Sequence, residues 1–94
     1  MSEHIITGID VGTFQVKVAI VRVPKIKGDR GLPQIIGTGF AESRGLRNGY
    51  IISETDVVRS IRSAVAEAEK AAGVEVKRAY VSIGSIGLDE VVST

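Results

Sequence analysis

The chain has no cysteine and no tryptophan, and its 94 residues include one histidine, His4. Without cysteine it forms no disulfide, no cysteine-ligated zinc or iron–sulfur centre, and has no thiol nucleophile. One histidine cannot build a histidine metal cluster, and the serines therefore lack the partner that a hydrolytic triad needs. These absences exclude most metal-based and covalent catalysis.

The chain also lacks an excess of positive or negative charge, since 12 Lys and Arg balance 11 Asp and Glu to a net charge of +1. This balance creates no field that would attract nucleic acid or an acidic membrane as the main partner. No apolar run approaches the roughly 20 residues that cross a bilayer. The start of the chain also lacks the basic and apolar segments of a signal peptide. We therefore expect a soluble, cytoplasmic protein that binds no nucleic acid.

Apolar, β-branched segments predict four strands, at residues 4–11, 14–23, 34–41 and 76–83. The second alternates with the period of two that a strand requires, and a tight turn joins it to the first as a hairpin. The fourth is expected to run parallel to one of the others, because a helix separates it from them. Prolines, glycines and charges predict an exposed connection at 24–33 and a polar loop at 42–50, and the apolar residues within 88–94 predict the start of another element.

One amphipathic helix is predicted between Ser53, as its N-cap, and Gly73, as the glycine that follows its last turn. We expect Glu67 and Lys70 to pair on its solvent side. Apolar side chains recur along the opposite side at three- and four-residue spacing, namely Val57, Val58, Ile61, Ala64, Val65, Ala68 and Ala72.

This order of elements predicts an α/β fold with a mixed sheet of about four strands and one covering helix. A chain of 94 residues has room for one domain. One helix covers a single face of a sheet, and the second strand becomes apolar on both faces, so the other face is left without a cover. We therefore expect residues 1–94 to form a single partial domain or a unit of an assembly.

The turn between the first two strands carries the residues with the clearest chemical potential. In Asp10-Val11-Gly12-Thr13, backbone amides can face an anion while the Asp10 carboxylate holds a hydrated Mg²⁺. Lys17 can reach a phosphate from the second strand. A simpler interpretation is that Asp10 and Gly12 only make a tight turn and that Lys17 is solvated. No Rossmann fingerprint and no Walker A motif is present.

The run Thr7-Gly8-Ile9-Asp10-Val11-Gly12-Thr13 resembles the first phosphate motif of the actin-like and heat-shock ATPase superfamily. Three further segments narrow the resemblance to the FtsA family of bacterial cell-division proteins. They are 35–39, the Ser43-Arg44-Gly45 loop with the residues up to Ile51, and 79–84 after the helix. Together these segments extend the resemblance over residues 5–85.

The resemblance implies the first half of subdomain 1A, with a ribonuclease-H-like sheet, from a protein that binds ATP and Mg²⁺ between two lobes. Asp10 would position the metal, and Gly12, Thr13 and Phe14 would form the phosphate-contacting turn. Gln15 stands where the family commonly has lysine, and Lys17 is the candidate substitute, as in the related pilus-assembly protein PilM. Residues 84–88 also depart from the family, which usually carries a histidine there. No catalytic residue is assigned.

FtsA-like proteins polymerise and recruit the tubulin-like protein FtsZ. They attach to the inner face of the membrane through a C-terminal helix, which lies beyond the position that corresponds to Thr94. The resemblance therefore implies part of a division protein that supports FtsZ assembly. Residues 1–94 alone are expected to be inactive as an ATPase, because phosphoryl transfer needs groups from both lobes. Two alternatives stay open: a self-assembly module that binds no nucleotide, and a PilM-like scaffold.

Overall fold

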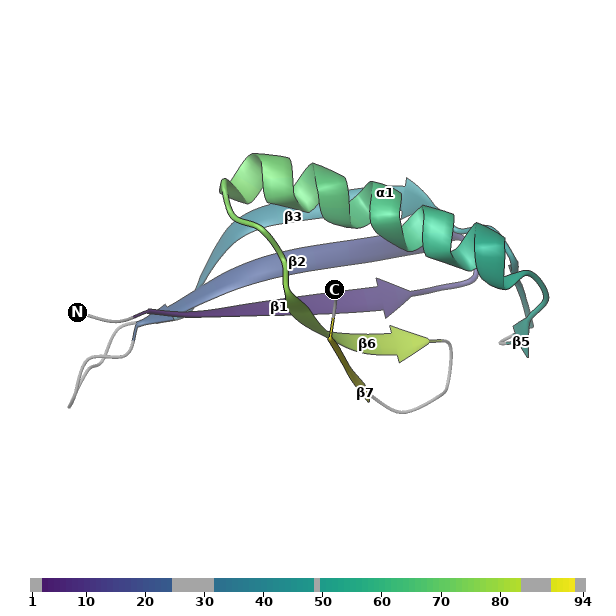
Figure 1. Ribbon diagram of the computed structural model, residues 1–94, viewed down its shortest axis with the longest axis horizontal. Helices are drawn as coiled ribbons and strands as arrows, with labels where there is room; N and C mark the ends of the chain where they lie inside the picture. Colours follow the sequence, from purple (N-terminus) through teal and green to yellow (C-terminus); the bar gives the residue numbers. More distant parts are fainter. Residues whose placement is uncertain (1–2, 25–31, 49, 84–88, 93–94) are drawn as a thin grey trace.

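In the computed structural model of the protein, residues 3–24, 32–48, 50–83 and 89–92 are described. One long helix lies across a twisted sheet (Figure 1). The elements in chain order are β1 (Glu3–Val11), β2 (Gln15–Pro24), β3 (Gln34–Glu42), β4 (Leu46–Arg47), β5 (Tyr50–Ile51), α1 (Glu54–Ala72), β6 (Arg78–Ile83) and β7 (Asp89–Val92).

Within the described residues, the main sheet has five strands in the order β3-β2-β1-β6-β7. β1 pairs antiparallel with β2 and parallel with β6, which confirms the predicted hairpin and the crossover through a helix. The four expected strands are therefore present in a mixed α/β arrangement. The fifth strand, β7, lies antiparallel to β6 and accounts for the apolar residues near the end of the chain.

Helix α1 begins and ends where the sequence predicts. The Ser53 hydroxyl accepts a hydrogen bond from the Asp56 amide at 3.3 Å. Gly73 has the left-handed conformation, with φ 73°, and its amide donates to the Glu69 carbonyl. Both ends therefore satisfy backbone groups that a helix leaves unpaired.

We expect Ser53→Ala to lower the free energy of unfolding by about 1 kcal/mol, because the N-cap acceptor for the Asp56 amide is lost. Urea denaturation followed by helix circular dichroism measures the change. Ser63→Ala is the matched control, since Ser63 is exposed in the middle of α1 and caps nothing. Equal stability of the two variants would contradict the assigned cap.

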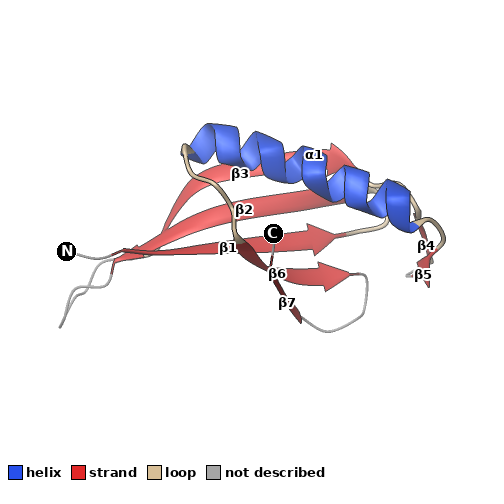
Figure 2. Ribbon diagram, viewed as in Figure 1, coloured by secondary structure: helices blue, strands red, loops and turns tan. Residues whose placement is uncertain are grey.

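The core lies between α1 and the sheet face beneath it. β2 supplies Val16, Val18 and Ile20, all nearly inaccessible to solvent. α1 lies mainly over β3 and to a lesser extent over β2 (Figure 2). The helix can lie so close because the alanines of α1 face Gly37 and Gly39 of β3. Among the described residues no element covers the opposite sheet face, as the single helix predicts.

The burial of two side chains of α1 differs from what their residue types predict. Val58, expected in the core, is 45% exposed, while Ser60 is 4% exposed. Glu67, expected to pair with Lys70, accepts a hydrogen bond from the Phe40 amide of β3 at 2.9 Å. The helix therefore contacts the sheet through polar groups as well as alanines.

The loop predicted at 42–50 contains a small hairpin. Leu46 pairs with Ile51 and Arg47 with Tyr50, as β4 and β5. Asn48 has a positive φ of 51°, and Asn-Gly between two short strands is a strong signal for a two-residue hairpin turn. Most of the connection predicted at 24–33, and the 84–88 segment that departs from the family pattern, lie outside the described residues.

Candidate functional site

The β1–β2 hairpin lies at the carboxyl end of β1, next to the end of the parallel strand β6 (Figure 1). The N-terminus of α1 and the β4–β5 hairpin lie at this same end of the molecule. In α/β folds, ligands bind beyond the carboxyl ends of parallel strands. The candidate residues of the sequence are therefore at the end of the sheet where a ligand site is expected.

Asp10 and Lys17 lie directly opposite each other across β1 and β2. On the other side of Asp10, the parallel strand β6 places Ser82 opposite it. Opposite residues of neighbouring strands lie on the same face of a sheet, and here it is the face that α1 does not cover. The structure therefore brings a carboxylate, an ammonium and a hydroxyl into one row.

That row borders a shallow depression of about 560 Å³ on the uncovered face. Gly8 and Ala19 are opposite each other in its centre, and Phe40 and Tyr80 line its sides. A Cβ added to Gly8 would meet no atom within 4 Å, so the space above it is open. Apart from its polar row, the depression is apolar in character.

Gly12 makes a close backbone contact inside the β1–β2 turn. Its amide donates to the Gln15 carbonyl at 3.0 Å, so this N–H is used inside the hairpin. Its φ is not positive, but a Cβ would lie 3.1 Å from the same carbonyl. Glycine is therefore favoured here by close backbone approach. Thr13, Phe14 and Gln15 are exposed at the tip, Phe14 by 86%.

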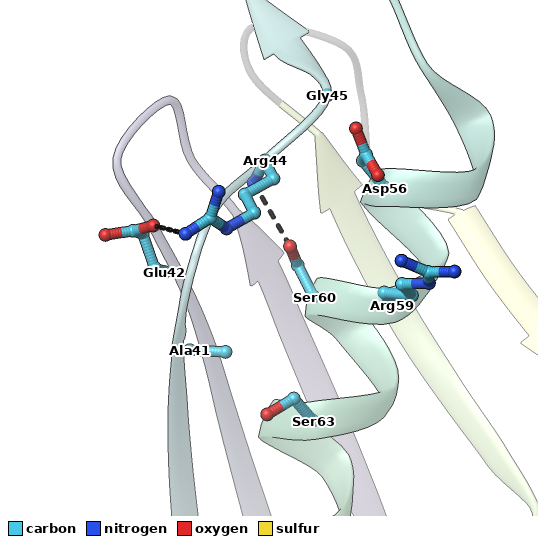
Figure 3. A pocket seen from close by; sticks show the side chains of 8 residues that line it. All are labelled: Ala41, Glu42, Arg44, Gly45, Asp56, Arg59, Ser60 and Ser63. Carbon is cyan, nitrogen blue, oxygen red and sulfur yellow. Dashed lines mark hydrogen bonds and ion pairs between the residues drawn. The ribbon is translucent and has the colours of Figure 1, made fainter.

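The end of β3 holds this hairpin from the side. The Ser43 amide donates to the Phe14 carbonyl at 3.0 Å. The next amide, that of Arg44, donates to the Ser60 hydroxyl of α1 at 3.1 Å (Figure 3). The sequence did not mark these serines as site residues. A serine on the apolar side of a helix was the available signal for Ser60.

A second, polar pocket of about 760 Å³ lies where β3 ends beside α1 (Figure 3). Arg44 forms an ion pair with Glu42 across 2.6 Å, and both side chains are about 70% exposed, so the pair contributes little stability. Arg59 and Ser63 also line the pocket, but none of the predicted phosphate or metal residues does.

Within the described residues no group of three or more His, Cys, Asp or Glu side chains is placed to hold a metal ion. A single carboxylate, Asp10, still suits Mg²⁺, which keeps several water ligands and combines one or two carboxylates with phosphate oxygens. The donor set therefore fits Mg²⁺ bound together with a phosphate ligand. No helix in the described part of the chain is long and apolar enough to cross a membrane.

Over most of its length the chain is similar to the N-terminal region of cell division protein FtsA from several bacteria. It is 34% identical over 82 residues to the protein of Pseudomonas aeruginosa. The aligned segment covers 87% of this chain and 19% of that relative. For Enterococcus faecalis the identity is 36% over 76 residues, and for Staphylococcus epidermidis 31% over 90 residues. The chain spans less than a fifth of the length of these relatives, and no protein-family model matches it.

Proposed function

We propose, from the premise that this chain is related to the N-terminal region of FtsA cell-division proteins, that it supplies one wall of a Mg²⁺–ATP site. The observation that carries the proposal is the pairing of Asp10 with Lys17 beside the β1–β2 hairpin. A carboxylate and an ammonium on one face, next to exposed turn amides, are the groups that a phosphate–metal ligand requires.

Each residue of the wall has a distinct role in this proposal. Asp10 would orient a water bound to Mg²⁺, and Lys17 would contact a phosphate oxygen as a point charge. Gly12, the Thr13 hydroxyl and the backbone at Phe14 and Gln15 would form the turn that faces the same phosphate. Within this turn the Gly12 amide is bonded to the Gln15 carbonyl. When bound, Mg²⁺ would neutralise phosphate charge. Hydrolysis would require groups from a second lobe.

The cellular role that we propose follows the relatives: participation in bacterial cell division, with an FtsZ-like tubulin homologue and further copies of the protein as partners. The site of action would be the cytoplasmic face of the membrane. One observation favours the alternative of a self-assembly module without nucleotide: the sheet face opposite α1 is uncovered among the described residues. The two functions differ in whether the β1–β2 hairpin binds phosphate.

We expect Mg²⁺–ATP to shift the amide resonances of Thr13, Phe14 and Gln15 in ¹⁵N NMR spectra of the chain, because these residues form the exposed tip. Removing a charged hydrogen-bonding partner costs about 1.5–3 kcal/mol. The Asp10→Ala and Lys17→Ala variants are therefore expected to bind at least about tenfold more weakly.

Lys77→Ala is the matched control, because it removes the same charge from an exposed position away from the hairpin. It should bind Mg²⁺–ATP as the unchanged chain does. Absence of any shift at the hairpin at millimolar Mg²⁺–ATP would overturn the proposed site. So would equal affinities of the Lys17→Ala and Lys77→Ala variants.

A further inference from the structure

Three successive residues after β3 bond to three different parts of the molecule. The Ser43 amide donates to the Phe14 carbonyl in the β1–β2 hairpin, and the Arg44 amide donates to Ser60 in α1. The Gly45 carbonyl then accepts from the amides of Ile52 and Ser53, at 2.7 and 3.1 Å, where α1 begins. The hairpin and the helix are therefore joined by the hydrogen bonds of three consecutive residues.

Ser60 is an unusual residue for its place. It is 4% exposed on the side of α1 that packs against the sheet, where Val57, Ala64 and Ala68 are also buried. A buried hydroxyl costs free energy unless it is hydrogen-bonded. Figure 3 shows the Ser60 hydroxyl directed at the backbone of Arg44, the bond that satisfies it. Packing alone would be served equally well by alanine.

The neighbouring hydroxyl, that of Ser43, is buried and has no hydrogen-bond partner within the described part of the chain. Buried polar atoms are seldom left unsatisfied, and each case requires a specific reason. This hydroxyl belongs to the residue whose amide holds the hairpin. The unpaired hydroxyl and the bond to the hairpin thus belong to the same residue.

We propose that Ser60 and Ser43 are positioning residues that couple the β1–β2 hairpin to α1. Ser60 holds the Arg44 peptide, the Arg44 peptide fixes Ser43, and Ser43 fixes the Phe14 carbonyl. The phosphate-facing backbone of the hairpin is thus set by a buried side chain of the helix. The identity of the ligand rests on the proposed function, whereas the coupling itself is a property of the hydrogen bonds described above.

Amide hydrogen exchange of the 94-residue chain, followed by NMR, tests the coupling in Ser60→Ala. The loss of one hydrogen bond changes an equilibrium constant about fivefold. We expect roughly fivefold faster exchange at Arg44, and also at Ser43 and Gly12, with unchanged exchange in the centre of β2. A merely local role of Ser60 would move Arg44 alone. Ser63→Ala is the control, because Ser63 lines the same pocket without a hydrogen bond to the backbone. The amides of this variant should exchange as those of the unchanged chain do.

NMR spectra of the same variants also test the effect of Ser60 on Mg²⁺–ATP binding. Ser60→Ala should reduce the Mg²⁺–ATP shifts of the Phe14 and Gln15 amides by a factor similar to the fivefold change in exchange. Ser60→Thr keeps the hydroxyl and should restore these shifts. Unchanged exchange at Ser43 and Gly12 in a folded Ser60→Ala chain would overturn the inference.

If Ser60→Ala does not fold, Ser60→Cys decides in the same way, through exchange at Gly12 and the shift at Phe14, because a thiol of similar size is only a weak acceptor for the Arg44 amide. Values for Ser60→Cys equal to those of the unchanged chain would overturn the inference, and faster exchange with a weaker shift would support it. A chain that shows the exchange effects but no Mg²⁺–ATP shift removes the proposed function and leaves the coupling standing.

Discussion

We expect Gly39→Ala to abolish the docking of α1 on β3 and to lower the free energy of unfolding by at least about 3 kcal/mol. A Cβ at this position would overlap the Ala64 carbonyl and lie 2.7 Å from the Ala68 nitrogen. Both atoms belong to the helix backbone, so no rotamer change relieves the contact and the whole helix must move. A small domain has only about 5–15 kcal/mol of stability in total. The loss is therefore a large fraction of the total stability, and we expect a clearly lower urea midpoint.

Gly8→Ala is the matched control, because Gly8 is also a strand glycine but a Cβ there would meet nothing within 4 Å. Alanine in place of a strand glycine should be neutral or stabilising by up to about 1 kcal/mol. Urea denaturation with tertiary and helical probes measures both variants. A Gly39→Ala chain as stable as Gly8→Ala would show that α1 does not lie against the β3 backbone.

The second large effect is expected at Gly45, for which we predict that Gly45→Ala lowers the free energy of unfolding by roughly 2 to 5 kcal/mol. Two penalties add at this position. Its φ of 84° is left-handed, which costs residues other than glycine about 1–2 kcal/mol. A Cβ would also overlap the Ser53 carbonyl and approach the Asp56 Cβ to 3.0 Å, at the beginning of α1.

Gly73→Ala separates these penalties. Gly73 has a φ of 73° but open space around the added Cβ, so it should lose only the conformational part, about 1–2 kcal/mol. The difference between the two variants in thermal or urea unfolding then measures the crowding at the helix start. Identical losses at Gly45 and Gly73 would contradict the close contact of the loop with Ser53.

The parts of the fold that could be predicted are those with a local cause. The caps of α1 follow from Ser53 and Gly73, and the alternation of Val16, Val18 and Ile20 fixes which face of β2 is buried. The hydrogen-bond partner of Ser60 and the bond from Phe40 to Glu67 could not be predicted, because each depends on which strand lies under the helix. The β4–β5 turn could have been predicted from Asn48 and the glycine that follows it.

For the candidate site, the alternation of side chains in a hairpin is enough to put Asp10 and Lys17 on one face once the turn length is known. In the structure the two residues are opposite each other on one face. The engagement of the Gly12 amide with Gln15 depends on the turn geometry, which Asp-Val-Gly-Thr alone does not specify. The phosphate and metal roles of these residues remain predictions, which the titration above tests.

The hydrogen bond from the Phe40 amide to Glu67 has a further consequence, for aggregation. β3 is an outer strand of the sheet, and an outer strand with free amides can recruit an extended segment of another chain. Glu67 occupies one such amide only while α1 is docked. Lifting the helix therefore frees this amide and uncovers the apolar side of β3 in a single event. We therefore expect undocking of α1 to open this edge of β3 to pairing with a strand of another chain.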